Sequence, residues 1–97
     1  MDGLDFTWDA TKAAVNRAKH GVSFEEAKTV FFDESARLIA DPDHSEEEDR
    51  FVLLGLSARL RVLLVCHVYR RGSTIRIISA RKANREEQRE YEGFKHA

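Results

Sequence analysis

The chain has 97 residues, of which 42% are hydrophobic and 34% charged, so it can form one packed core but is too short for two. The longest apolar run, residues 62–66, is too short to cross a membrane, and residues 1–5, with two acids and no base, do not fit a secretory signal peptide. A single cysteine, Cys66, excludes an internal disulfide and fits a reducing compartment. We therefore expect one cytoplasmic domain spanning residues 1–97, with no membrane segment.

The formal net charge of −1 conceals an uneven distribution. Residues 1–59 carry 7 basic and 13 acidic side chains, whereas residues 60–97 carry 9 basic and 4 acidic ones. A basic surface in the second half would attract phosphate, although charge alone favours mutual neutralisation of the halves or a solubilising role. The four histidines are scattered too widely for zinc spacing, so no metal site is predicted.

The N-terminal segment predicts a strand followed by a helix. Residues 4–8 alternate apolar and polar side chains, which is typical of a half-buried strand. Asp9 and Gly21 are typical caps for a helix over Ala10–His20, whose alanines and Val15 predict a shallow buried stripe. On the same helix, helical spacing predicts one shared exposed face for Lys12, Asn16 and Lys19.

A second helix is predicted after Ser23. Ser23 and Glu26 have the spacing of a capping box, and apolar residues continue at helical spacing to about Phe32. Residues 36–40 then predict a short strand. The acidic segment 41–49 contains the only proline and is expected to be a solvated loop; a divalent-cation site there is less favoured, because it has no glycine to form the turn of a calcium loop.

The second half of the chain is organised around a predicted hairpin. Apolar and β-branched residues crowd segments 61–69 and 74–81, and Gly72 between them can adopt the positive φ of a short turn. Residues 50–57 predict the preceding strand, in which Gly55 indicates a bulge or a close backbone approach.

The last predicted element is a highly charged helix over residues 84–95, with Tyr91 and Phe94 as its apolar pair. Such a helix packs weakly, docks through a narrow stripe or waits for a partner. The predicted order is β-α-α-β-β-β-β-α. It indicates an α+β fold in which two N-terminal helices and a C-terminal helix lie on a mainly antiparallel sheet.

Cationic side chains within this sheet are the strongest candidates for function. Alternation places Arg61 and His67 on one face of the first hairpin strand. On the second strand, Arg76 and Arg81 are an odd number of residues apart, so they are expected on opposite faces unless a bulge intervenes. At most one of them is then expected to share a site with His67.

Arginine suits phosphate binding because its planar guanidinium is always charged and donates two parallel hydrogen bonds. Metal-free RNA cleavage needs such a group, together with a base for the 2′-hydroxyl and an acid for the leaving oxygen. His20, His67, Lys19 and glutamate side chains are candidate proton carriers, and Trp8 is a candidate for stacking on a base. Each has a structural alternative: ion pairs for the arginines, a hydrogen-bonded sheet position for His67, a helix C-terminus for His20 and core packing for Trp8.

The sequence resembles the BrnT family of toxins. Its opening, FTWDATKAAVNRAKHGVSFEEAKTVFFD, contains the family's F-x-W-D pattern and then K-x-x-x-N-x-x-K-H-G-V-S-F-E-E-A. The segments DPDHSEEEDRFVLLGLS and IRIISARKANREEQREYE also fit the family, in which R-I-I-S-A-R-x-A leads into a charged helix. The resemblance covers nearly the whole chain.

This resemblance implies a RelE-like fold and a metal-independent endoribonuclease without cofactors, which is the toxin of a type II toxin–antitoxin pair and halts translation by cleaving RNA. The implied partners are RNA, whether free or on the ribosome, and a BrnA-type ribbon-helix-helix antitoxin that neutralises the toxin and carries it to promoter DNA. The antitoxin is expected to cover the exposed side of the sheet and the C-terminal helix. On the basis of this resemblance Arg81 is the first active-site candidate, Arg61 and Arg76 come next, and His20, Lys19 and Trp8 follow. With His67 added as a candidate proton carrier, the expected catalytic residues are Arg81, Arg61, Arg76, His20 and His67. The expected substrate-binding residues are Lys19, Trp8 and Lys12.

The alternative is a non-catalytic protein- or nucleic-acid-binding module, such as a degenerate toxin or a co-repressor subunit. It would bind nucleic acid in a salt-dependent way without forming products.

Overall fold

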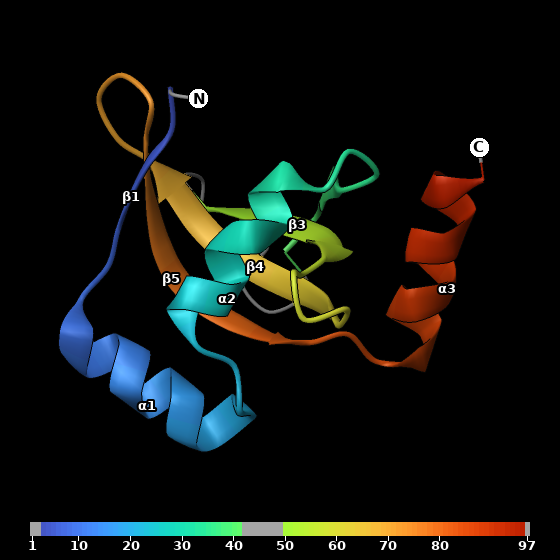
Figure 1. Ribbon diagram of the computed structural model, residues 1–97, viewed down its shortest axis with the longest axis horizontal. Coiled ribbons are helices and arrows are strands. Elements are labelled where there is room, and N and C mark those ends of the chain that lie inside the picture. The colour runs from blue at the N-terminus through green and yellow to red at the C-terminus, as the bar shows by residue number, and fades with distance from the viewer. Residues whose placement is uncertain (1–2, 42–49, 97) are drawn as a thin grey trace.

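The structure, a computed structural model, describes residues 3–41 and 50–96, which form a five-stranded sheet with helices against it (Figure 1). The strand order is β1-β5-β4-β3-β2, in which β1 is parallel to β5 and the other neighbours are antiparallel. The elements are β1 (Asp5–Thr7), α1 (Ala10–His20), α2 (Phe24–Thr29), the 3₁₀ helix η1 (Val30–Phe32), β2 (Arg37–Ile39), β3 (Phe51–Leu56), β4 (Val62–Tyr69), β5 (Thr74–Lys82) and α3 (Arg85–Lys95). This order confirms the predicted α+β fold. Among the described helices, none is long and apolar enough to span a membrane.

The predicted elements are all present, with small differences at their ends. Helix α1 has the predicted bounds, whereas α2 ends at Thr29 and continues as the tighter η1 to Phe32. Arg61 was expected in the first hairpin strand but precedes β4, and β5 continues to Lys82. The predicted loop and the disfavoured cation site over residues 41–49 lie outside the described residues, apart from Asp41, which is buried.

Two hydrophobic clusters cover the two faces of the sheet. In Figure 1, α2 lies across one face while α3 stands at the far end of the sheet from α1. The cluster under α1 and α2 contains Val22, Phe24, Ala27, Val30, Leu63, Val65, Ile77 and Ala80. The cluster on the other face contains Val52, Leu54, Leu64, Cys66, Ala83 and Tyr91, with Phe94 against it. Helix α3 therefore docks through a narrow stripe, which is one of the three alternatives that its sequence left open.

Helix α1 does not bury the predicted alanine stripe. Most of those alanines and Val15 are exposed, while Asn16, expected on the exposed face, is only 6% exposed. The Asn16 Nδ2 donates to the carbonyls of Val22 (3.0 Å) and Ala80 (2.9 Å), and its Oδ1 accepts from the Ala80 N–H (3.1 Å). Because β1 pairs with β5 only over 74–76, the next part of this strand edge is open, and the Asn16 amide takes the place of a neighbouring strand there.

Two glycines have the roles that their positions predicted. Gly72 adopts a φ of 63° in the β4–β5 turn. A Cβ on Gly55 would lie 2.7 Å from the Cβ of Ala36 and 2.8 Å from the Cγ1 of Val30, so this residue allows a close approach and not a bulge. The bulge of the sheet lies elsewhere. Cys66 pairs with Ser79 but His67 pairs with Ile77, which leaves Ile78 as an extra residue in β5.

Candidate functional site

The β5 bulge places Arg76 and Arg81 on the same face of the sheet. Their partners on β4 are Val68 and Leu64, which share a face with Cys66, the partner of Ser79. Opposite faces were expected only without a bulge, and the bulge is present here: one extra residue reverses the alternation of side chains beyond it. The same face now carries a row of polar side chains along β5: Arg76, Ser79 and Arg81. His67 lies on the opposite face, so neither arginine shares a site with it.

Arg81 ends this row in a bidentate contact with the first turns of α3. Its Nη1 lies 3.0 Å from Glu87 Oε1 and its Nη2 lies 3.0 Å from Glu87 Oε2. Glu87 Oε1 also accepts from the Asn84 N–H at 2.9 Å and so completes a capping box that begins α3. The hydrogen bonds from Arg81 lower the pKa of Glu87, and the Arg81 side chain remains 28% exposed. A carboxylate thus occupies the guanidinium fork in the geometry that a phosphate would use.

A groove of about 270 Å³ runs between α1 and β5 next to this row. It brings together three of the predicted site residues, Lys12, Lys19 and His20. The described residues that line it are Thr11, Lys12, Val15, Asn16, Lys19, His20, Ile78 and Ser79, and none of these carries a carboxylate. Since Ser79 belongs both to the groove and to the polar row of β5, the groove and Arg81 are neighbouring parts of one surface.

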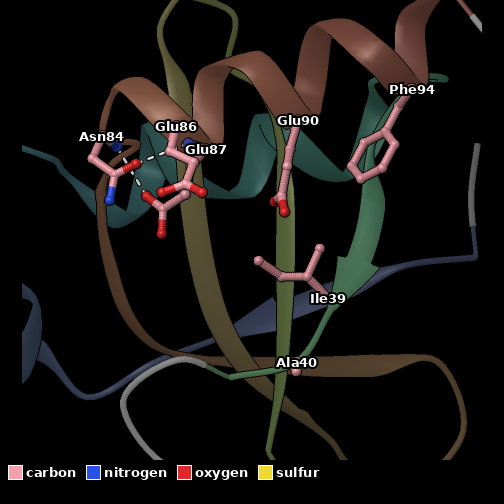
Figure 2. A pocket seen from close by; sticks show the side chains of 7 residues that line it. All are labelled: Ile39, Ala40, Asn84, Glu86, Glu87, Glu90 and Phe94. Carbon is pink, nitrogen blue, oxygen red and sulfur yellow. Dashed lines mark hydrogen bonds between the residues drawn. The ribbon is translucent and has the colours of Figure 1, made fainter.

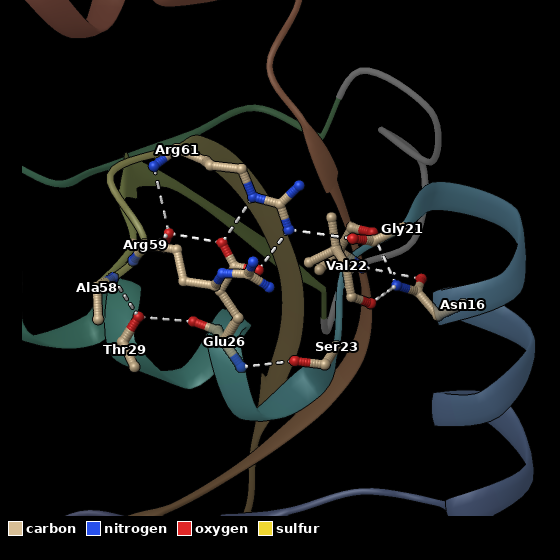
Figure 3. Close-up of polar contacts among 11 residues, drawn as sticks. Asn16, Gly21, Val22, Ser23, Glu26, Thr29, Ala58, Arg59 and Arg61 are labelled. Carbon is tan, nitrogen blue, oxygen red and sulfur yellow. Dashed lines mark hydrogen bonds and ion pairs between the residues drawn. The ribbon is translucent and has the colours of Figure 1, made fainter.

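Arg61 is held on the other side of the sheet by a buried carboxylate (Figure 3). Its Nε donates to Glu26 Oε2 at 3.0 Å, and its Nη2 donates both to Glu26 Oε1 and to the Gly21 carbonyl. Ser57 Oγ donates to the same carboxylate at 2.7 Å, and these contacts lower the pKa of Glu26. The predicted capping box is therefore only half formed. Ser23 accepts from the Glu26 N–H, while the Glu26 side chain turns to Arg61. These contacts account for Arg61 without a substrate.

His67 is fully buried in a cluster of aromatic rings. Its Nδ1 lies 2.9 Å from the Val65 carbonyl, which can only accept, so Nδ1 carries the proton and Nε2 faces the Tyr69 hydroxyl at 3.3 Å. The Phe31 ring packs edge-on at 4.8 Å. Burial lowers the pKa of His67, because the charged imidazolium would lose its hydration. Its environment is that of a hydrogen-bonded sheet histidine.

Trp8 packs edge-on against Phe24 at 5.9 Å and belongs to the margin of the core. A second pocket, of about 340 Å³, lies between α3 and the end of β2 (Figure 2). Glu86, Glu87 and Glu90 line it, so its charge opposes phosphate binding. Within residues 3–41 and 50–96, no three metal-ligating side chains gather into a possible metal site.

Sequence reasoning missed two residues of this surface, Asn16 and Glu87. Asn84 and Glu87 have capping-box spacing, which could have placed Glu87 at the start of α3 and therefore close to the end of β5. Asn16 stands out only as the N of the family pattern K-x-x-x-N-x-x-K-H-G, and periodicity does not reveal its role, because it bonds to backbone groups of Val22 and of the distant Ala80.

Comparison with known proteins gives a consistent result. The profile of the family described as "Ribonuclease toxin, BrnT, of type II toxin-antitoxin system" matches residues 8–87. Among solved structures, the chain is similar to the 1.1 Å crystal structure of the Brucella abortus ribonuclease toxin BrnT, with a TM-score of 0.67 and 24% sequence identity. The match covers 84% of this chain and 99% of that chain, and it supports the fold. No curated protein sequence matches.

Proposed function

Because the chain belongs to the BrnT family of ribonuclease toxins of type II toxin–antitoxin systems, we propose that it cleaves RNA at the sheet face that carries Arg76 and Arg81. The observation that carries this proposal is the partly exposed Arg81 side chain, whose guanidinium holds a carboxylate through two parallel hydrogen bonds. Arg76 lies on the same face because of the bulge, so a second positive charge lies along the path of an RNA backbone.

In the proposed reaction, the RNA phosphate replaces Glu87 in the Arg81 fork. The 2′-oxygen forms a bond to phosphorus as its proton passes to a base, and the bond from phosphorus to the 5′-oxygen breaks as that oxygen gains a proton. Arg81 stabilises the negative charge that builds up on the phosphoryl oxygens. His20 is the better placed histidine for proton transfer, since it lines the groove that contains Ser79, whereas His67 is buried on the opposite face.

We propose further that the reaction needs no metal, since arginine and lysine side chains can supply the positive charge. The family implies an antitoxin partner, and we propose a BrnA-type ribbon-helix-helix protein that inhibits the toxin and brings it to promoter DNA. Cleavage of cellular RNA would place the protein in the cytoplasm, where loss of mRNA halts translation.

The test is cleavage of a defined mRNA by the purified protein, mapped by primer extension with and without EDTA, and repeated in a cell-free translation reaction. We expect discrete cuts that persist in EDTA on the purified RNA. Arg81→Ala should reduce cleavage by about 100-fold or more, whereas Arg89→Ala, at an exposed position of α3, should leave it unchanged. Unchanged cleavage by folded Arg81→Ala would refute the assigned role. Intact RNA in every reaction would favour the non-catalytic binding module.

A second variant tests the role of Glu87. Glu87→Gln can still accept from the Asn84 N–H but no longer neutralises Arg81, so we expect tighter binding of RNA in a filter-binding assay. Weaker binding by a folded variant would mean that Glu87 holds Arg81 in its working orientation and is not a competitor of phosphate.

A further inference from the structure

We propose that the groove between α1 and β5 binds one nucleotide of single-stranded RNA, with its base against Val15 and Ile78 and its flanking phosphates at Lys12 and Lys19. This inference rests on the proposed function only in the choice of RNA as the ligand. It assigns a binding subsite for one nucleotide, and of the residues that line the groove only His20 also takes part in the proposed reaction at Arg81.

The walls of the groove are fixed in place. Asn16 joins the middle of α1 to β5 through its two hydrogen bonds with Ala80, and its third bond, to Val22, secures the segment that follows α1. All three bonds are buried, so water does not compete for them. A site whose walls are held in this way loses little conformational entropy when a ligand binds.

The groove combines an apolar surface with positive charge. Val15 is 60% exposed, although it lies on the helix face that lines the groove, and Ile78 is the extra residue of the bulge. A flat base can pack on such side chains, since every base presents an apolar face. Lys12 and Lys19 are two helical turns apart, about 10.5 Å along the axis, so they can contact different phosphates of one strand. Ser79 lies on the opposite wall, on β5.

The charges of the two pockets select the ligand. Among the described residues that line it, the α1–β5 groove has two lysines and no carboxylate, whereas three glutamates line the α3–β2 pocket (Figure 2). A polyanion will therefore prefer the first. A single strand fits better than a duplex, because paired and stacked bases cannot enter a groove.

The position of the groove connects it to the proposed reacting centre. Ser79 and Arg81 are two residues apart on one face of β5, which corresponds to about 6.7 Å along the strand. An RNA strand that places a base in the groove can therefore present a neighbouring phosphate to Arg81. The base in the groove would then influence where the RNA is cut.

The probe is a fluorescein-labelled 2′-O-methyl RNA octamer of mixed sequence, which cannot be cleaved because its 2′-oxygen carries no proton. Binding is measured by anisotropy between 0.05 and 0.2 M salt, a range of about fourfold around the working ionic strength. The test variant is Lys12→Gln/Lys19→Gln. The matched control is Arg17→Gln/Lys28→Gln, which removes the same charge from α1 and α2 outside the groove.

If Lys12→Gln/Lys19→Gln loses two phosphate contacts, the plot of log association constant against log salt concentration should become shallower by about 1.4. This change corresponds to about 25-fold weaker binding at 0.1 M salt. The control should change binding far less. In a two-dimensional NMR titration of the wild-type protein, the amide signals of Val15 and Ser79 should shift.

Equal weakening in both variants would overturn the proposal, because it would show only a general charge effect. Shifts confined to the region of Glu86–Phe94, or equal affinity for a duplex of the same sequence, would also overturn it. The proposed ribonuclease activity can be refuted independently of this subsite. If the protein binds the octamer in the groove but leaves ordinary RNA intact, the subsite is supported and the enzymatic function is refuted.

Discussion

Replacing Asn16 tests how α1 is attached to the sheet. Asn16→Ala removes three buried hydrogen bonds, two to Ala80 and one to Val22, each with a net value of about 0.5–1.5 kcal/mol. The backbone groups of Ala80 and Val22 would be left to water that must enter the interface. We expect a loss of about 3 kcal/mol in the free energy of unfolding, which in a domain of this size lowers Tm by about 12–24 °C.

The measurement is urea unfolding followed by circular dichroism, with Lys19→Ala as the control. Lys19 is exposed on the same helix, so its loss should change stability by less than about 0.5 kcal/mol. Asn16→Asp separates the bond that Asn16 accepts from the two that it donates. The aspartate carboxylate can accept from the Ala80 N–H but cannot donate to the carbonyl of Ala80 or Val22, so this variant should be at least as unstable as Asn16→Ala at pH 7. A loss below about 0.5 kcal/mol in Asn16→Ala would refute the reasoning, since three buried bonds cannot have so small an effect.

Three further predictions concern groups on the helix-covered side and in α3. Burial lowers the pKa of His67, so the folded state resists its protonation. The free energy of unfolding should therefore fall as the pH drops below about 6.5, by up to about 2 kcal/mol at pH 5. Urea unfolding at several pH values should show that His67→Gln lacks this pH dependence, and an unchanged pH dependence would contradict the prediction. Burial, together with the hydrogen bond that Tyr91 donates to Asp33 Oδ2 at 2.7 Å, raises the pKa of Tyr91 to about 12. Loss of this bond in Tyr91→Phe should lower the free energy of unfolding by about 1.5–3 kcal/mol, measured by urea unfolding at pH 7, and a neutral result would contradict the bond. Arg61→Ala leaves the buried Glu26 carboxylate without its cation and should lower the free energy of unfolding by about 2–4 kcal/mol, while RNA cleavage per folded molecule stays unchanged. A variant that keeps full stability but loses cleavage would return Arg61 to the catalytic residues.

The order and type of the elements could be predicted because local signals agree with the fold. Asp9 and Gly21 cap α1 as their chemistry suggests: the Asp9 carboxylate accepts from Lys12 N–H at 2.9 Å, and Gly21 adopts a φ of 70°. The buried face of α1 could not be predicted. Its decisive contact is an amide on a distant strand edge, and a single Asn among alanines carries no hydrophobic signal.

The candidate site was only partly predictable for a similar reason. The arginines of β5 were identified from residue type, but their common face depends on one extra residue, Ile78, and a bulge of this kind has no sequence marker here. Arg61 and His67 are of residue types that often act in catalysis, so residue type alone could not distinguish them from functional residues. Their buried partners, Glu26 and Val65, become apparent only when the chain is folded.

The attachment of both N-terminal elements to β5 has a consequence for synthesis. β1 pairs with residues 74–76 and α1 is joined to Ala80, so neither has its sheet partner until the last strand has been made. At 5–20 residues per second, the ribosome needs about 4–14 s to advance from β1 to residue 76. During that time the hydrophobic side chains of the N-terminal segment have no sheet to cover them. The same order of events delays the polar row of β5 and helix α3, so a nascent chain has no complete toxin surface until the residues of α3 have been made.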